Sequence, residues 1–365
     1  MKNYKVLPEY PVYDDIWRYM ARETRPLLIY GMGNGADKLI NYGAGRGIEF
    51  ADIFASDGFV RGHSFRGMRV KSFSEIKETY SDFVIVLSFA SSRPEVLSML
   101  KDLNEKYTVI VPDMPVAGED YFTCEFYNEH YYDIKRAYDS LCDDSSRELF
   151  ASIINYKLTG HMSCILDKCD SVSDIYSLLP KEIESYADCG AYNGDTVREA
   201  LEFLPGLKKI FAYEPDKRNF LKLEKFCAEL DGRVEIFPRN AAVWSENTKG
   251  AFFESGNRNS TVSATASYKN REEETGLLRL DTDIKSPLNL IKYDVEGAER
   301  KALEGSEGII SKHRPALMIS LYHRSEDIFS LVNLVREKYP FYKLHLKRTE
   351  CLPAWEILLV AVAEA

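Results

Sequence analysis

Short apolar runs alternate with stretches of helical periodicity along most of this 365-residue chain. Apolar runs of roughly four to eight residues between polar turns are typical of buried parallel strands, and amphipathic spacing between them predicts helices. This alternation predicts an α/β fold. It is interrupted in the middle of the chain, and the length is too great for one ordinary core, so we expect two domains.

The first block, residues 1–118, predicts a small Rossmann-like domain with a parallel sheet and an aromatic N-terminal arm. Its expected strands are 26–30, 48–55, 83–87 and 108–111, and its expected helices are 37–42, 72–80 and 95–106. Residues 119–180 mix aromatic and acidic side chains at helical spacing and predict a helical bridge and connector. Within it, Asp143 to Ser146 supply helix caps and Gly160 ends a helix.

The second block, residues 181–365, predicts a larger doubly wound sheet of seven strands. The expected strands are 183–187, 209–213, 234–237, 289–293, 316–321, 342–346 and 356–362, and the expected helices lie near 195–203, 216–230, 298–311 and 325–338. No helix separates the last two strands, so one of them should run antiparallel. The polar interval 245–283 predicts a hairpin and a mobile lid over 255–275, with hydroxyls from Ser260, Thr261 or Ser263 reaching a polar acceptor.

Composition narrows the class of protein. A net charge of −10 argues against nucleic acid or an anionic membrane as the main partner. The seven cysteines are scattered without zinc-ligand spacing, which is typical of reduced thiols and predicts no dedicated metal site. The N-terminus lacks the apolar segment of a signal peptide, and no apolar run is long enough to span a bilayer. We therefore expect a cytoplasmic protein.

The segment from Asp188 to Thr196 is the most informative motif. A strand-like run ends on Asp188, Gly190 and Gly194 follow, and Thr196 lies at the expected helix start. Glycines there let the backbone approach a ligand, and free N–H groups at a helix start can bind its polar atoms. Glu214 ends the next strand-like run, where an acid can accept hydrogen bonds from ribose hydroxyls. The acid beside these glycines would repel a pyrophosphate, which favours a cationic or neutral nucleoside such as S-adenosylmethionine.

Each motif residue receives an expected role in binding that nucleoside. Asp188 should orient the loop or receive the methionine amino group, and Asn193 and Thr196 can contact its carboxylate. Glu214 should hold the ribose. Asn240 and Ala241, after the third strand, should border the adenine.

Asp294, Glu296 and His323 are the expected catalytic residues, and Asp294 is also expected to contribute to binding of the nucleoside. Asp294 and Glu296 follow the strand expected beside the first one. At that point of the sheet the bound nucleoside and the molecule that reacts with it, the acceptor, would meet. These paired acids could bind acceptor hydroxyls, act as a base, or hold a metal with a third ligand. His323 follows another strand at the same edge, and a neutral imidazole there could remove a hydroxyl proton. Alternatively, His323 only packs or caps the next helix, and the acids only complement a helix dipole.

The chain resembles the FkbM-type family of S-adenosylmethionine-dependent methyltransferases. Four blocks carry the resemblance, together with Leu321-Tyr322-His323: residues 188–196, 213–216, 240–243 and 291–299, the last containing Asp-Val-Glu-Gly-Ala-Glu. The resemblance covers residue 182 to the end and implies a class I methyltransferase sheet. It also implies methyl transfer, usually to oxygen, on sugars, polyketides or other small metabolites. Cys189 departs from the valine or isoleucine of many members.

The N-terminal block carries a second glycine motif. Gly31-Met32-Gly33-Asn34-Gly35-Ala36 fits a dinucleotide fingerprint with alanine last, and Asp57 follows the next expected strand. This block looks like Rossmann-like domains attached to sugar-modifying enzymes. It could bind a nucleotide or nucleotide-sugar, or serve only to present substrate. An NAD-dependent sugar oxidoreductase is a poorer alternative, because no catalytic tyrosine–lysine or histidine pair can be placed.

The sequence therefore predicts a methyltransferase acting on a hydroxyl of a small, sugar-like or secondary-metabolite acceptor. The alternative of another class is a non-catalytic nucleotide-binding or regulatory module. An assembly of identical chains is left open by the sequence.

Overall fold

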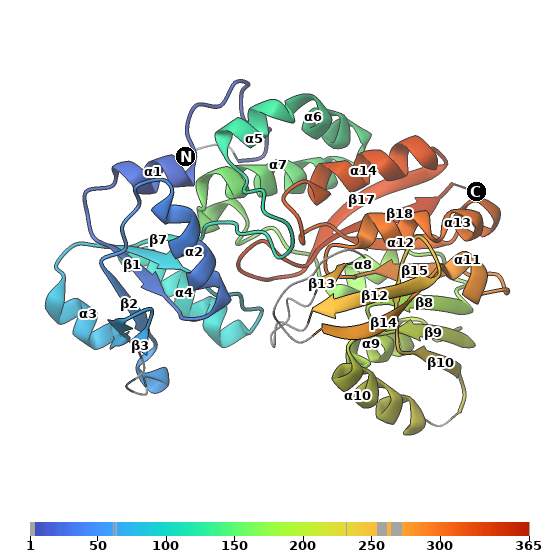
Figure 1. Cartoon of the computed structure of the whole chain (residues 1–365). Helices are drawn as coiled ribbons and strands as arrows, with labels where there is room; N and C mark the ends of the chain where they lie inside the picture. Colours follow the sequence, from blue (N-terminus) through green and yellow to red (C-terminus); the bar gives the residue numbers. More distant parts are fainter. Residues whose placement is uncertain are drawn as a thin grey trace.

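The chain forms two α/β units, each built around a mainly parallel sheet (Figure 1). The computed structural model describes residues 4–60, 62, 64–230, 232–253, 261–263 and 272–364. Within this part of the chain, no helix combines the length and the apolar character needed to cross a bilayer. The predicted α/β class and the two separate sheets are confirmed.

The N-terminal unit is a five-stranded parallel sheet. Its strands are β1 (Leu27–Tyr30), β2 (Asp52–Ala55), β5 (Lys71–Ser72), β6 (Val84–Leu87) and β7 (Thr108–Ile110), in the order β5-β2-β1-β6-β7. The helices between them are α2 (Asn34–Ala44), α3 (Phe73–Thr79) and α4 (Pro94–Lys106), and a small hairpin joins β3 (Ser64–Phe65) to β4 (Met68–Arg69). The strand order reverses between β1 and β6.

The strand predicted from residue 48 is shorter in the structure. Ile48 is buried, but its N–H donates to the carbonyl of Gly43, a bond that closes the C-terminus of α2. Its apolar side chain therefore packs against the end of a helix rather than within the sheet. The two-residue edge strand β5 was not predicted, because two residues leave no detectable period.

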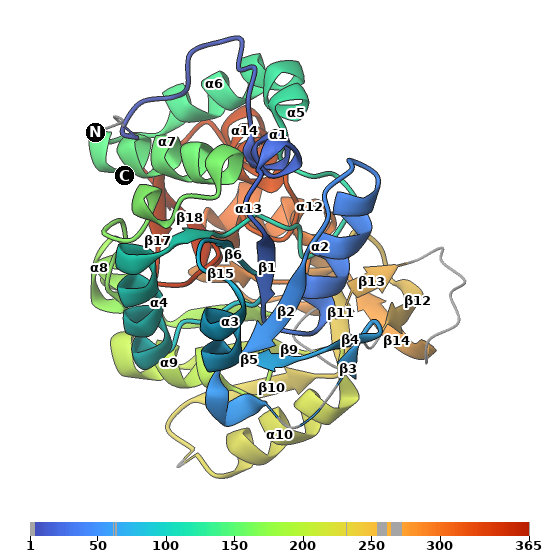
Figure 2. The same ribbon diagram turned by 90° about the vertical axis from the view of Figure 1, so that its left-hand side faces the viewer.

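The chain segment that connects the two sheets is helical, and we call it the helical layer. It contains α5 (Cys124–Glu129), α6 (Tyr131–Ser140), α7 (Asp144–Thr159) and the short α8 (Val172–Ser177), while the N-terminal arm forms α1 (Ile16–Arg22). As predicted, Asp143 caps α7 by accepting from the Ser146 N–H at 2.7 Å, and Gly160 ends it. Figures 1 and 2 place α6 and α7 beside α14 (Asp327–Lys338) of the C-terminal unit.

The C-terminal unit is the predicted seven-stranded sheet. Its strands are β8 (Ser185–Cys189), β9 (Lys209–Tyr213), β10 (Glu235–Arg239), β15 (Leu290–Tyr293), β16 (Ala316–Ser320), β17 (Tyr342–Arg348) and β18 (Ile357–Ala363). Their order is β10-β9-β8-β15-β16-β18-β17, and β18 runs antiparallel to both neighbours, as the missing last helix predicted. The strand order reverses between β8 and β15.

The helices of this unit follow the prediction with two exceptions, an unpredicted short helix over 280–283 and a helix that is divided in two. They are α9 (Asp195–Phe203), α10 (Lys217–Ala228), α11 (Leu280–Asp283), α12 (Glu299–Glu304), α13 (Glu307–His313) and α14. The single helix expected over 298–311 is divided into α12 and α13 at Gly305. A Cβ at Gly305 would lie 1.9 Å from the carbonyl oxygen of Trp244, so the helix breaks where the neighbouring backbone approaches it.

The polar interval after β10 forms a separate small sheet. Its strands are β11 (Ala241–Val243), β12 (Thr248–Phe253), β13 (Thr261–Ser263) and β14 (Glu272–Leu278), in the order β11-β14-β12-β13. The antiparallel pairing of β12 with β14 confirms the predicted hairpin. Residues 254–260 and 264–271, which include Ser260, lie outside the described residues, so the lid stays a prediction.

A buried ion pair anchors the helical layer to the N-terminal sheet. Lys157 Nζ of α7 lies 2.6 Å from Asp113 Oδ2, just after β7, and the two side chains are 2% and 5% exposed. Removing one partner of such a pair leaves a buried charge without compensation, which is strongly destabilising.

We therefore expect Lys157→Met to lower the free energy of unfolding by about 3–5 kcal/mol. The matched control is Lys135→Met, which breaks the exposed pair of Lys135 with Asp139 and should cost about 0–1 kcal/mol. Urea denaturation followed by circular dichroism measures both. Equal losses in the two variants would contradict the anchoring role of Lys157.

Candidate active site

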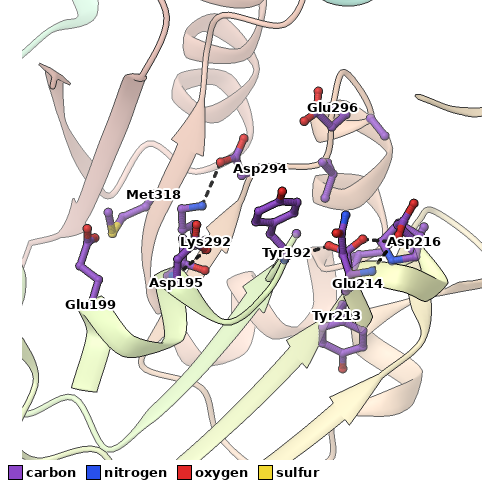
Figure 3. A pocket seen from close by; sticks show the side chains of 18 of the residues that line it. Tyr192, Asp195, Glu199, Tyr213, Glu214, Asp216, Lys292, Asp294, Glu296 and Met318 are labelled. Carbon is purple, nitrogen blue, oxygen red and sulfur yellow. Dashed lines mark hydrogen bonds and ion pairs between the residues drawn. The ribbon is translucent and has the colours of Figure 1, made fainter. Parts of the chain in front are cut away.

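A cavity of about 690 Å³ opens at the carboxyl ends of β8, β9 and β15 (Figure 3). This is the point where the strand order of the seven-stranded sheet reverses, and open α/β sheets bind ligands at such points. We call it the C-terminal cavity. Of the residues predicted from the sequence, those lining it are Gly190, Thr196, Glu214, Ala241, Asp294 and Glu296.

Gly190 brings the first loop against the end of β15. Its φ is +103°, and a Cβ there would lie 1.9 Å from the carbonyl oxygen of Asp294. Only glycine fits both the conformation and the space. The β8–α9 loop and the loop after β15 therefore meet side by side at the cavity.

Asp188 holds this loop from behind rather than lining the cavity. It is fully buried, and its Oδ2 accepts from the hydroxyl of Thr196 at 2.5 Å. Its Oδ1 has no hydrogen-bond partner among the described residues, and burial raises the pKa of this carboxyl. Asn193 also lies outside the cavity lining, where its side chain accepts from the Asp195 N–H at the start of α9. Gly194, with φ +90°, directly precedes that helix.

Glu214 is fixed by the backbone on the next wall. Its two carboxyl oxygens accept from the N–H groups of Tyr192 and Asp216, each at 2.8 Å. Burial raises the pKa of Glu214 to about 8 despite these bonds. Asn240 does not line the cavity; it donates to the carbonyls of Glu214 and Pro215 and so holds this turn in place.

Asp294 is held on the opposite wall. Lys292 Nζ lies 3.0 Å from its Oδ2, and the hydroxyl of Tyr322 donates to its Oδ1 at 3.2 Å. Burial alone would raise the pKa of Asp294, but the charges of Lys292 and His323 outweigh it and lower the pKa. Figure 3 shows Lys292 directed at this carboxylate. Asp294 is therefore a fixed anion.

Glu296 differs from Asp294 in its protonation. It has a left-handed backbone, with φ +54°, and its side chain is 35% exposed. Burial and the neighbouring carboxylates raise the pKa of Glu296 to about 7, although His323 opposes the shift. A carboxyl with a pKa near neutrality can exchange a proton at working pH.

His323 lies behind these acids, which corrects the expected neutral imidazole. Its ring is fully buried and does not line the cavity, with Nδ1 2.8 Å from Glu299 Oε1. Its Nε2 lies 3.5 Å from Asp294 Oδ1 and 3.6 Å from Glu296 Oε2. Burial alone would lower the pKa of His323, but the three carboxylates raise it to about 10. The ring is an imidazolium at neutral pH and cannot accept a proton there.

The same cluster has the spacing of a possible cation site. One atom each from Asp294, Glu299 and His323 lies within 4.8 Å of the others. A metal ion would have to displace the proton that these carboxylates hold on the ring. The ion pairs account for the arrangement without one.

The family model of the FkbM methyltransferase domain matches residues 188–342. The matched segment contains every residue placed above at the cavity, from the glycine loop to His323. Residues 188–342 thus resemble an FkbM methyltransferase domain, and we call this segment the FkbM-type domain.

Solved structures extend this likeness. A methyltransferase FkbM from Methylobacillus flagellatus KT is 19% identical, with a TM-score of 0.70, and the likeness covers 93% of this chain and 90% of that one. The shared fold thus includes the N-terminal unit and the helical layer. An rRNA methylase from Streptococcus thermophilus is 13% identical, with a TM-score of 0.36, over 53% of this chain and 94% of its own. A methyltransferase from Streptococcus mutans in complex with SAH is 11% identical, with a TM-score of 0.34, over 52% of this chain and 95% of its own. No curated protein matches the chain.

Sequence reasoning missed several residues of the FkbM-type site. Lys292 lies two residues before Asp294. Side chains two residues apart on a strand lie on the same face, so this spacing could have indicated Lys292 from the sequence. Tyr322 directly precedes His323 but received no role. Glu356 and Thr349, which also line the cavity, come from the β17–β18 loop, and nothing in the local sequence indicates that this loop reaches the site.

We predict that His323→Gln destabilises the domain in a pH-dependent way. Because the folded pKa of His323 is raised to about 10, its ion pairs stabilise fully below about pH 6.5, and this is lost as the pH rises through 10. The variant should cost about 3–5 kcal/mol near pH 6.5 and less at pH 10.

Urea denaturation of wild type and variant across this range measures the difference. His345→Gln is the control, because the pair of His345 with Asp143 is partly exposed. A difference that does not change with pH would show that the His323 ring is not charged in the folded protein.

Proposed function

We propose that the FkbM-type domain transfers a methyl group from S-adenosylmethionine to a hydroxyl of a small acceptor in the C-terminal cavity. One observation carries the proposal: Gly190 and Glu214, from the loops after β8 and β9, line the same cavity as Asp294 and Glu296 from the loop after β15. The first pair has the chemistry to hold a nucleoside, and the second has the chemistry to receive a hydroxyl.

The charge of the lining supports a cationic donor. Acidic side chains outnumber basic ones there: the acids are Asp195, Glu199, Glu214, Asp216, Asp294, Glu296 and Glu356, and the bases are Arg218, Lys222 and Lys292. Such a lining favours a sulfonium over an anionic ligand. Asp188 and Thr196 support the loop that would hold the methionine end, and Ala241 offers an apolar edge to the adenine.

Glu214 is suited to the ribose. The N–H groups of Tyr192 and Asp216 use one lone pair on each carboxyl oxygen, so in the ionised form each oxygen can accept one more hydrogen bond. Two adjacent ribose hydroxyls match that geometry.

Glu296 is the proposed base. The bound donor supplies an electrophilic methyl carbon. The acceptor oxygen forms a bond to that carbon as the carbon–sulfur bond breaks, and the hydroxyl proton goes to the Glu296 carboxylate. Asp294, fixed by Lys292 and Tyr322, orients the hydroxyl. The imidazolium of His323 keeps Glu296 partly ionised at neutral pH, so it is a positioning residue. Alignment of the acceptor oxygen with the methyl group supplies the rest of the rate enhancement.

We expect Glu214→Ala to weaken binding of S-adenosylhomocysteine by about 2–4 kcal/mol, roughly 30-fold or more, because two hydrogen bonds to the ribose are lost. Calorimetry measures the affinity, and thermal unfolding confirms that the variant is folded. Glu202→Ala removes an exposed acid of α9 outside the cavity and is the control for net charge. Unchanged affinity in Glu214→Ala would remove the ribose assignment.

We expect Glu296→Gln to lower the rate of methyl transfer by about 10²–10⁴-fold while leaving affinity for S-adenosylhomocysteine nearly unchanged. The wild-type rate should rise as the pH increases through about 7, where the Glu296 carboxyl loses its proton. The acceptor for this assay comes from a metabolite screen for a mass gain of one methyl group.

Glu304→Gln, which changes a partly exposed acid of α12 paired with Lys301, is the control for this measurement. A wild-type rate in Glu296→Gln would move the role of base to another group. A rate that does not change between pH 6 and pH 8 would have the same meaning.

A further inference from the structure

A second cavity, of about 510 Å³, lies in the N-terminal unit. We call it the N-terminal cavity. Its walls come from the segments that follow β1, β6 and β7, including Gly33, Ser88 and Pro112. The order of the five-stranded sheet reverses between β1 and β6, so this cavity also occupies the point where open α/β sheets bind ligands.

The two cavities have opposite charge. Among the described residues that line the N-terminal cavity none is acidic, whereas Lys38 and Arg93 are basic. The C-terminal cavity is lined mainly by acids, and the whole chain carries −10. A lining without acids in a protein of this charge favours an anionic ligand.

The lining also offers specific contacts. Arg93 presents an exposed guanidinium, now paired with Glu95, which can bind a phosphate through two parallel hydrogen bonds. The first turn of the 11-residue helix α2 opens onto the same space at Asn34 and Gly35. The rings of Phe89 and Trp355 form apolar walls, and Trp355 Nε1 is a buried donor without a partner among the described residues.

A dinucleotide is a poorer fit for this cavity. Asp57, the acid expected to hold its ribose, does not line the cavity. Its carboxylate instead accepts from the Phe73 N–H at 3.0 Å and from the Ser74 hydroxyl at 3.1 Å, and so caps α3. The glycine motif therefore forms a cavity without the acid that the dinucleotide interpretation requires.

Two chain segments form walls of the N-terminal cavity and continue to residues in or behind the C-terminal cavity. Val111, Pro112 and residues 114–116 line the N-terminal cavity, and the next residue, Ala117, donates its N–H to the carbonyl of His323 at 2.8 Å. Trp355 lines the N-terminal cavity, and the next residue, Glu356, lines the C-terminal one. The Trp355 ring also stacks on Tyr322, which contacts Asp294.

This shared wall is fixed between the two units. Ser91, after β6, and Leu352, in the β17–β18 loop, exchange backbone hydrogen bonds of 2.8 and 3.0 Å. A ligand in the N-terminal cavity thus lies against residues that border the proposed site of methyl transfer. Trp355, which lines the N-terminal cavity, and Tyr322, which lines the C-terminal one, are in contact through their rings.

We propose that the N-terminal cavity binds the phosphate-bearing end of the methyl acceptor. The acceptor is then a sugar or similar polyol carrying a phosphate or diphosphate, with its hydroxyl directed past Trp355 toward Glu296. Arg93 binds the phosphate and determines specificity. This assignment rests on the proposed methyl transfer.

The test begins with protein saturated with S-adenosylhomocysteine, so that added ligands report on the second cavity. Calorimetry with uridine diphosphate and with inorganic pyrophosphate should show binding of both. Arg93→Glu should weaken binding about tenfold or more. Arg69→Glu is the matched control, because Arg69 is an exposed arginine of the same unit, paired with Glu75, outside the cavity.

A turnover measurement connects this binding to the acceptor. Labelled methyl transfer is followed with a panel of hexose phosphates, uridine-diphosphate hexoses and the same hexoses without phosphate. Transfer should require the phosphate, and Arg93→Glu should raise KM about tenfold or more with little change in kcat.

Four outcomes would overturn the proposal. They are no binding of either phosphate probe, equal effects of Arg93→Glu and Arg69→Glu, equal transfer to unphosphorylated hexoses, and an unchanged KM in Arg93→Glu. Binding of S-adenosylhomocysteine is measured first and separates this result from the proposed function. If that nucleoside does not bind, methyl transfer itself fails, together with the acceptor assignment. If it binds but the phosphate probes do not, only the role of the N-terminal cavity fails.

Discussion

The contact between Gly190 and the carbonyl of Asp294 is the constraint on which the site depends. A Cβ at position 190 would lie 1.9 Å from that oxygen, so the loops after β8 and β15 can meet only because this residue has no side chain. Their meeting puts the groups suited to a nucleoside beside the groups suited to a hydroxyl. Parallel pairing of β8 with β15 brings the loops to one edge, and the glycine allows the final approach.

The acids of the site are expensive to bury, and the structure compensates each of them differently. Backbone N–H groups bind Glu214, Lys292 is paired with Asp294, and the imidazolium of His323 neutralises Glu299. Glu296 receives less compensation than Asp294 in the same loop, so its pKa rises to about 7 while the pKa of Asp294 is lowered. Differences in compensation among neighbouring carboxyls can therefore produce one fixed anion and one proton acceptor in the same loop.

The sequence was sufficient to predict the two main sheets and the edge at which the carboxyl ends of their parallel strands lie. Apolar runs located β9 within its observed bounds, and the polar residues that follow β8, β9 and β15 could be assigned to one edge because parallel strands end together. The sequence was insufficient to predict how deeply a side chain is buried or which charge it carries. Whether His323 faces the cavity or lies beneath it depends on the packing of Glu299 from α12, which is set by contacts between distant segments. Asn193 and Asn240 likewise lie near the cavity but outside its lining, because their side chains support turns.

The bridge between Ser91 and Leu352 has a consequence for how the molecule is made. Among these 365 residues, the β17–β18 hairpin is the last part to leave the ribosome, whereas the five-stranded sheet is complete much earlier. Domains generally fold as units, N-terminal first, during synthesis. The N-terminal unit can therefore form its sheet while one wall of its cavity is still missing. Both cavities are closed by one late loop, so neither can be finished in a nascent chain from which that loop is absent.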